Sequence, residues 1–460
     1  MGLTEKLARH VVDLDFDKLP RTVVTATKRI FLDLLGTTLA GSSAQGCRIV
    51  VDTAKTWGGK KESTIIAYGG KVPAQMASLC NGTMGHALDF DDTHDLAVLH
   101  TSTCVVPAAL AVAEKAETSG KEFITAIALG MDIHCRMGAA AEETITTTGW
   151  IYTATMGIFG AALAAGKILG LDKEKLLNAI GISYSSASGN MQSVIEGALT
   201  KRLQAGLSAM GGVLAASLAQ KGFTGPKHAL EGEYGFYAVY QDGKYNPRKL
   251  TEGLGSRFEI LNLSLKPYPC CRHAHSSIDA ILEAQHKYNI NLADLENIEI
   301  GVNRSAYSAV CEPSELKHKP LTPVDAQFSI PYVVACALTQ KRVTIEDFTD
   351  EAIKRRSIME VVRKVKPYVD TEIERNSHRR ITPAKLKIKM KDGRSHTVFV
   401  NVPKGDPANP MTKEEANEKF RSCCRHAVRR LGNKRVEEII RLVDNIEDVE
   451  NINELTELLA

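Results

Sequence analysis

The chain has 460 residues, of which 44% are hydrophobic and 24% are charged, and its formal net charge is +3. A chain of this length exceeds one ordinary hydrophobic core, so we expect two domains. The composition is that of an average globular protein, which excludes a disordered chain, a collagen and a disulfide scaffold. The small net charge does not indicate binding to nucleic acid or to an anionic membrane surface, and we expect neither partner.

The cysteines and the first residues of the chain indicate a cytoplasmic protein. Ten cysteines are scattered along the sequence and include the adjacent pairs Cys270-Cys271 and Cys423-Cys424, a pattern that suits neither a disulfide framework nor repeated CxxC zinc sites. The first 20 residues lack the apolar run of an export signal. Residues 144–166 carry no charge but are rich in Gly, Ala and Thr, which predicts a buried helix of a globular domain rather than a membrane span.

Helical signals dominate the first 265 residues. Pro20 and Pro107 are favourable first-turn residues, and a helical segment follows each of them. Runs of small residues at 157–171 and 208–222 allow helices to pack closely. Strand signals are almost absent before residue 290, so this part of the chain predicts a large helical domain.

The pattern changes further along the chain. Residues 296–303 and 384–402 alternate apolar and polar side chains, and the second stretch contains Asp392-Gly393, a pair typical of hairpin turns. After Pro403 the sequence returns to charged amphipathic helices. We therefore predict a mostly α fold, with a discontinuous all-helical domain at residues 1–265 and 405–460 and a smaller α+β domain at residues 266–404.

The densest group of titratable side chains lies between His86 and Ser102 and includes four acids and three histidines. If this segment opens as a helix, His86, Asp89 and Thr93 lie on one face and can converge on a ligand. The group could alternatively bind a divalent metal, or it could consist of helix caps and buried hydrogen-bond partners. We predict no functional metal, because no second ligand cluster stands at zinc-like spacing.

Two further groups of basic residues stand out. Lys201-Arg202 interrupts a stretch of small and apolar residues, which indicates either an anion site or a charged helix end that reaches solvent. Residues 266–275 combine four basic groups and two cysteines in a loop stiffened by two prolines, at the expected domain boundary. We expect its cysteines to be core residues rather than nucleophiles, because no companion motif activates them.

Nucleotide-binding motifs are absent from the sequence. No GxGxxG follows an early strand and no GxxxxGK[ST] occurs, so dinucleotides and nucleoside triphosphates have no visible binding loop. We expect a site without a cofactor. Its carboxylate, hydroxyl, imidazole and ammonium groups suit proton transfer next to a carboxylate.

Several motifs resemble signatures of the MmgE/PrpD family. The resemblance extends over nearly the whole chain, because further stretches match in order and spacing. The strongest motifs are NGTMGHALDFDDTHD (81–95), LHTSTCVVPAALAVAE (99–114) and KPYPCCRHAHSSIDAI (266–281).

The resemblance implies a large helical domain built from both chain ends, a smaller α+β lid, and a homodimer with its pocket at the domain junction. Known members of the family include 2-methylcitrate dehydratase, cis-aconitate decarboxylase and iminodisuccinate epimerase, which act on small polycarboxylates without a cofactor. The pocket positions that the family implies for this sequence are Asp89, Thr93, His100, Lys201, Lys266, Cys271 and His275.

The roles implied by the family follow from its substrates. Lys201 and Lys266 would be fixed counter-charges for carboxylates whose charge grows as an enediolate forms. Asp89, Thr93 and His100 would move the α-proton and hold the leaving hydroxyl. Cys271 and His275 would contribute to substrate binding.

One position departs from the family pattern. The family typically has Gly-Trp-His before its Thr-rich turn, whereas this sequence has Ile151 after Trp150. We expect Tyr152 or His100 to supply the proton that the missing histidine would deliver. We also expect the apolar Ile151 to suit a substrate with an alkyl substituent, and to disfavour decarboxylation of cis-aconitate.

Together these observations predict a cofactor-independent hydro-lyase of the 2-methylcitrate dehydratase type. Three alternatives stay open: an epimerase or racemase of an iminodicarboxylate or similar acid, a lyase like cis-aconitate decarboxylase, and a non-catalytic dimer that binds a polycarboxylate.

Overall fold

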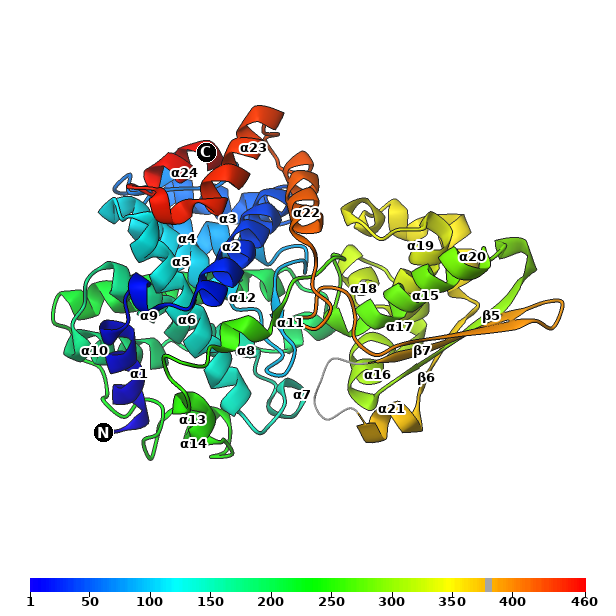
Figure 1. Cartoon of the computed structure of the whole chain (residues 1–460), viewed down its shortest axis with the longest axis horizontal. Helices are drawn as coiled ribbons and strands as arrows, with labels where there is room; N and C mark the ends of the chain where they lie inside the picture. The colour runs from blue at the N-terminus through cyan, green and yellow to red at the C-terminus, as the bar shows by residue number, and fades with distance from the viewer. Residues whose placement is uncertain (377–382) are drawn as a thin grey trace. The chain divides into compact units, whose positions relative to one another are not determined.

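The computed structural model describes residues 1–376 and 383–460, and these form two compact units (Figure 1). Unit 1 comprises Met1–Leu265 and Thr412–Ala460, and unit 2 comprises Lys266–Met411. Each unit has its own hydrophobic core.

The predicted fold class is confirmed. Unit 1 is built of helices with two short strand pairs, and unit 2 combines helices with a four-stranded sheet. The predicted domain boundaries lie after residues 265 and 404, whereas the compact units divide after Leu265 and Met411. That these segments fold as independent domains stays a prediction.

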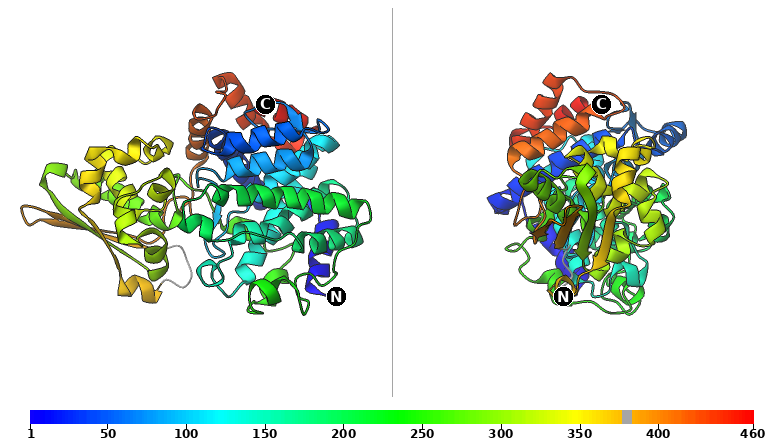
Figure 2. Two further views of the ribbon diagram at one scale, coloured as in Figure 1. Left: turned by 180° about the vertical axis from the view of Figure 1, so that it is seen from behind. Right: turned by 90° about the vertical axis from the view of Figure 1, so that its right-hand side faces the viewer.

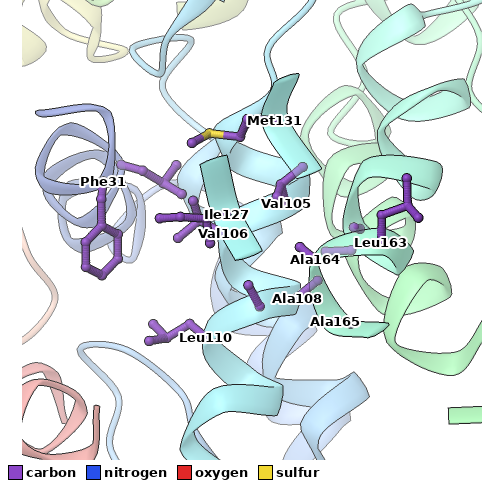
Figure 3. Close-up of a cluster of buried hydrophobic side chains, with 14 of the residues drawn as sticks. Phe31, Val105, Val106, Ala108, Leu110, Ile127, Met131, Leu163, Ala164 and Ala165 are labelled. Carbon is purple, nitrogen blue, oxygen red and sulfur yellow. The ribbon is translucent and has the colours of Figure 1, made fainter. Parts of the chain in front are cut away.

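The interior of unit 1 consists of helices rich in alanine and glycine. Figure 3 shows Ala108 and Ala164 between two of these helices, with Ile127 and Phe31 on the other side. Small side chains let helix backbones approach closely, as the sequence predicted for residues 157–171 and 208–222. The interior helices are α4 (Ala74–Gly85), α5 (Ser102–Ala116), α6 (Gly120–Ala140), α9 (Gly157–Ile168) and α12 (Thr200–Gln220).

Gly206 determines how closely α12 approaches α4. A Cβ atom at this position would lie 2.4 Å from the carbonyl oxygen of Leu79 and 2.3 Å from the hydroxyl of Thr83. Only glycine therefore fits at this contact. The close approach also places the start of α12 beside residues 86–101, which connect α4 to α5. We call this segment the acidic loop, because it contains four aspartates.

The other helices of unit 1 surround this interior, and the end of the chain returns to it. Figure 1 shows the last helices beside α2 and α3, which explains why this unit is discontinuous in sequence. The longer surrounding helices are α1 (Leu3–Asp13), α2 (Arg21–Gly41), α3 (Cys47–Trp57), α10 (Lys173–Tyr184), α22 (Lys413–Arg425), α23 (Asn433–Asp444) and α24 (Asn453–Leu459). The short elements are α7 (Ile145–Thr148), α8 (Tyr152–Thr155), α11 (Gln192–Ile195), α13 (Phe236–Tyr240), α14 (Pro247–Thr251), β1 (Ser63–Thr64) paired with β2 (Lys71–Val72), and β3 (Thr93–His94) paired with β4 (Leu263–Ser264).

Two predicted helices differ from the structure. The helix expected to begin at Pro107 begins at Ser102, and Pro107 lies inside it, because an upstream carboxylate binds the first backbone amides. The uncharged stretch at residues 144–166 is three helices rather than one. Gly149, with φ of +73°, ends the first of them in the left-handed conformation.

Unit 2 is organised around a mixed sheet, with the strands in the order β6-β5-β7-β8. The alternating sequences predicted the hairpin, and Gly393 adopts φ of +86° in its turn. α15 packs on β7 and β8, and α19 packs on β6 (Figure 2). The strands are β5 (Leu295–Val302), β6 (Val365–Val369), β7 (Ala384–Met390) and β8 (Ser395–Val400), and the helices are α15 (His275–Tyr288), α16 (Arg304–Val310), α17 (Ser314–His318), α18 (Pro323–Gln327), α19 (Ile330–Gln340), α20 (Arg356–Val362) and α21 (Thr371–Asn376).

Among the described helices, none combines the length and the apolar character that crossing a membrane requires. The ten cysteines all lie within the described residues, are buried, and form no disulfide.

We predict that Gly206→Ala destabilises the protein by about 1 to 3 kcal/mol, because the added methyl group meets backbone that cannot move aside. Gly211→Ala is the matched control on the same helix. Its Cβ would meet only the flexible end of Ile158, at 2.7 Å, and alanine is the better helix former. Urea unfolding of both variants checks the prediction, and equal stabilities would contradict it.

Candidate active site

A loop between α4 and α5 carries the densest group of titratable side chains. α4 ends at Gly85 and His86 caps it. Asp89 then adopts φ of +52°, in the left-handed region that few residues other than glycine occupy. The chain leaves the helix before Asp89. The prediction that His86, Asp89 and Thr93 share one face of a helix is therefore wrong.

Asp92 fastens this loop to the start of α5. Its carboxylate accepts hydrogen bonds from the backbone N–H groups of Thr101 (3.2 Å) and Ser102 (3.1 Å), and from the hydroxyl of Ser102. Burial and then the neighbouring Asp91 carboxylate raise the pKa of Asp92 to about 7. The hydrogen bonds from Ser102 and Thr101 favour the charged form and lower the pKa, but burial and Asp91 have the larger effect.

Asp89 forms an ion pair with Lys201. The Lys201 ammonium donates to Asp89 Oδ1 at 2.6 Å, and both side chains are largely buried. Lys201 stands in the first turn of α12, where a cation is unfavourable because of the helix dipole. Its neighbour Arg202 instead donates to the carbonyl of Gln45 at 2.9 Å. Of the two adjacent cations, Lys201 is therefore the one directed at the acidic loop.

Two imidazoles lie beside this ion pair. His86 Nδ1 lies 2.8 Å from Asp91 Oδ2, and His100 Nδ1 lies 3.6 Å from the same oxygen. The rings meet edge to face, with centroids 4.8 Å apart. Burial lowers the pKa of His86, which favours its neutral form.

The hydrogen bonds of His100 fix its tautomer. Its Nδ1 lies 2.6 Å from the backbone carbonyl oxygen of Asp92, and because a carbonyl only accepts, the proton sits on Nδ1. In the neutral ring, Nε2 then carries the lone pair. In that tautomer, Nε2 is the ring nitrogen that can accept a proton.

The same residues could be considered as metal ligands. One atom each of His86, Asp89 and His100 lies within 4.8 Å of the others. The Asp89 oxygen, however, already accepts a hydrogen bond from the Lys201 ammonium. A divalent ion would compete with that ammonium for Asp89, so the donor set fits proton transfer better than metal binding.

Thr93 is held by a strand pair rather than by a helix. It is buried and pairs with Ser264 of β4. The next residue, His94, lies 3.3 Å from Glu259 Oε2 through Nε2, and this hydrogen bond is the main reason that the pKa of Glu259 falls to about 2. Thr93 is therefore in a rigid position.

Tyr152 and Ile151 occupy the start of α8. The Tyr152 hydroxyl lies 2.8 Å from the carbonyl oxygen of Glu143 and 3.0 Å from Gln241 Oε1. Ile151 is half-buried and donates its backbone N–H to the carbonyl of Gly189. The role of Tyr152 as a proton donor stays a prediction.

The remaining predicted residues belong to unit 2. Lys266 is 1% exposed and Cys271 9% exposed. Arg272 Nη1 lies 3.3 Å from His275 Nδ1, and His275 Nε2 lies 3.2 Å from the carbonyl oxygen of Cys270. Because the guanidinium only donates, His275 accepts at Nδ1 and carries its proton on Nε2. The segment from Lys266 to His275 is thus a buried and ordered part of unit 2.

The structure brings Asp89, His100 and Lys201 together in unit 1, and their roles in a pocket stay a prediction. The prediction did not select Asp91, although it stands inside the same motif. Its contacts with two imidazoles depend on the loop conformation, and the repeated acids of the motif are the only sequence signal that could have indicated it.

The chain belongs to the MmgE/PrpD family. The model of the MmgE/PrpD N-terminal domain matches residues 5–248, and that of the C-terminal domain matches residues 268–448. The family inferred from the sequence motifs is therefore confirmed.

Relatives with named activities match over nearly their whole length. A protein named cis-aconitate decarboxylase from Aspergillus terreus (strain NIH 2624 / FGSC A1156) is 28% identical over 99% of this chain and 96% of its own. The human cis-aconitate decarboxylase is 28% identical over 100% of this chain and 94% of its own. The mitochondrial 2-methylcitrate dehydratase of Yarrowia lipolytica is 26% identical over 95% of this chain and 86% of its own.

We predict that Asp92→Asn removes a pH dependence of stability. The folded chain holds the Asp92 proton up to about pH 7, whereas an unfolded chain loses it near pH 4. Between these values the folded state binds the extra proton, so wild-type stability falls as pH rises, by up to about 1.4 kcal/mol per pH unit. The variant lacks this contribution.

Urea unfolding at pH 5, 6 and 7 measures the difference. Asp172→Asn is the control, because Asp172 caps the exposed start of α10 through the backbone N–H of Lys175. If the free energy of unfolding changed with pH equally in wild type and in Asp92→Asn, burial would not retain the Asp92 proton, and the prediction would be wrong.

Proposed function

We propose that this protein is a cofactor-independent lyase that breaks a bond next to a carboxylate of a small polycarboxylate, and that its reaction is a decarboxylation of the cis-aconitate type. The observation that carries the reaction class is the buried Asp89–Lys201 pair beside His100, whose Nδ1 hydrogen bond to a carbonyl places the lone pair of the neutral ring on Nε2. The choice of decarboxylation is supported by relatives of that name, which are about as long as this chain. It replaces the dehydratase as our main hypothesis.

The chemistry of such a substrate fits these groups. Loss of carbon dioxide breaks one carbon–carbon bond, and the electron pair of that bond forms a new double bond at the carbon that carried the leaving group. The electrons of the original double bond move to the carbon beside the carboxylate at the far end of the molecule. The charge that grows there needs a fixed cation, which we assign to Lys201. One proton then adds to the carbon beside that carboxylate. We assign its delivery to His100, which first takes up this proton from solvent at Nε2 and returns to the neutral ring when it gives the proton to the carbon. No oxidant or reductant is required.

Dehydration of a hydroxylated polycarboxylate is the second candidate. It needs the same cation and a base for the α-proton, while the departing hydroxyl takes up a proton. Ile151 favours this alternative, because an apolar wall would suit a methyl substituent. A relative named 2-methylcitrate dehydratase also matches most of the chain.

We further propose that Lys266, Cys271 and His275 bind substrate and that Thr93 holds a hydroxyl or carboxylate group. Support for the Lys266 assignment comes from the family motif at residues 266–281, which begins with this lysine. We also propose that the active protein is a homodimer, as the family implies.

Proton NMR in heavy water separates the alternatives. The purified protein is incubated with cis-aconitate, 2-methylcitrate and an iminodicarboxylate, in the presence of a chelator. We expect carbon dioxide and a product with one new C–D bond from cis-aconitate. Turnover of 2-methylcitrate alone would favour the dehydratase. Deuterium exchange into an intact iminodicarboxylate would indicate an epimerase, and absence of any exchange would indicate a binding protein.

We predict that Lys201→Ala and Lys266→Ala each lower kcat/KM by an amount equivalent to about 2 to 4 kcal/mol, the scale of one preorganised charge contact. Lys221→Ala, at the exposed end of the helix that carries Lys201, is the control and should retain activity. Steady-state kinetics on the identified substrate checks the prediction. Wild-type turnover by either variant would remove that lysine from the mechanism.

We predict that His100→Asn lowers kcat by about 10²- to 10⁴-fold, the usual contribution of a general acid or base. Tyr152→Phe should lower it less than about tenfold, because the Tyr152 hydroxyl lies against Glu143 and Gln241. Rate measurements on both variants decide between the two proton donors. A large loss with Tyr152→Phe and a small loss with His100→Asn would assign the proton to Tyr152.

A further inference from the structure

A buried lysine from the end of the chain contacts the acidic loop. Lys419, on α22, forms an ion pair with Asp33 of α2 at 2.6 Å, and both residues are more than nine-tenths buried. The same ammonium donates to the backbone carbonyl of Phe90 at 2.8 Å and lies 3.9 Å from the centre of the Phe90 ring. Lys419 therefore holds the Phe90 carbonyl through a hydrogen bond and its ring through a cation–π contact.

Phe90 stands between the two functional parts of the loop. The residue before it, Asp89, pairs with Lys201, and the residue after it, Asp91, contacts His86. Asp89 adopts a left-handed backbone conformation, which is unfavourable for a residue with a side chain. Such a conformation persists only where the surrounding contacts hold the chain on either side.

A buried ion pair alone adds little stability, because removing two charges from water costs about as much as their attraction returns. The Lys419–Asp33 pair can therefore be explained better by what it fixes than by the energy it supplies. What it fixes is the peptide group between Phe90 and Asp91 and the ring of Phe90.

We propose that Lys419 is a positioning residue of the active site, with Asp33 as the group that keeps its ammonium in place. Through Phe90, Lys419 sets the conformation in which Asp89 meets Lys201 and Asp91 meets His86. The proposal rests on the function proposed above for its kinetic readout, but its structural readout is independent of any substrate.

A second lysine provides a matched control. Lys28 also connects α2 to the last part of the chain, because it pairs with Glu447 and donates to the carbonyl of Asp444 at 2.8 Å. Its described contacts lie outside the acidic loop. Lys28→Met should therefore report the effect of loosening the C-terminal helices without disturbing Phe90.

The first experiment compares Lys419→Met with Lys28→Met by hydrogen exchange at residues 88–93 and by kinetics. We expect Lys419→Met alone to speed exchange at these amides, and to lower kcat by about 10- to 100-fold, the scale of a displacement of about 1 Å. KM should change less than threefold. Unchanged exchange in Lys419→Met would overturn the proposal whether or not a substrate has been found.

The second experiment separates positioning from stability. Lys419→Met combined with Asp33→Leu replaces the ion pair by apolar side chains, which is often neutral for stability, but still leaves the Phe90 carbonyl without its ammonium donor. We expect the melting temperature to recover while kcat stays low. Recovery of wild-type kcat would show that the pair is only structural.

Asp33→Asn is the milder variant if the double variant does not fold. Its amide oxygen can still accept from Lys419, so Phe90 should keep its donor and kcat should stay within about threefold of wild type, as for a neutral replacement of an intact contact. A loss as large as that of Lys419→Met would overturn the assignment of Phe90 as the contact that matters. If wild type turns over no polycarboxylate, the proposed function fails, and exchange at residues 88–93 still tests this proposal.

Discussion

The burial of several carboxylates among helices of small residues is the constraint on which the site depends. A carboxylate inside a protein needs a cation or several donors, since desolvation otherwise favours its protonated form. Each contact that compensates a charge here also fixes the direction of a functional group. The compensating partners are Lys201 for Asp89, His86 for Asp91, the amides of Thr101 and Ser102 for Asp92, and Lys419 for Asp33.

Local sequence patterns predicted the parts of the structure that local forces determine. Alternation at residues 296–303 and 384–402 indicated the strands, because one face of each strand is buried. The family motifs indicated Asp89, His100 and Lys201, which the structure brings together. The left-handed Asp89 was not predictable, because it depends on contacts that the loop makes with distant segments. The donation from Lys419 to Phe90, for example, joins residues 329 positions apart.

The Asp89–Lys201 pair also constrains how a polycarboxylate would bind. An incoming carboxylate must share the Lys201 ammonium with Asp89, and the proximity of two anions costs energy unless one of them takes up a proton. Under the proposed function, substrate binding and protonation of the site are then linked. His86 and His100, whose rings meet edge to face nearby, are the imidazoles that lie closest to this proton.

The return of the C-terminal helices to unit 1 determines when the site can form during synthesis. α22 to α24 leave the ribosome only after the whole of unit 2, yet they supply contacts to the earliest parts of the chain, including the bond from the backbone N–H of Ala67 to the carbonyl of Leu459 at 2.8 Å. The nascent N-terminal helices must therefore keep an incomplete core, with Asp33 lacking its cation, while about 150 residues are translated.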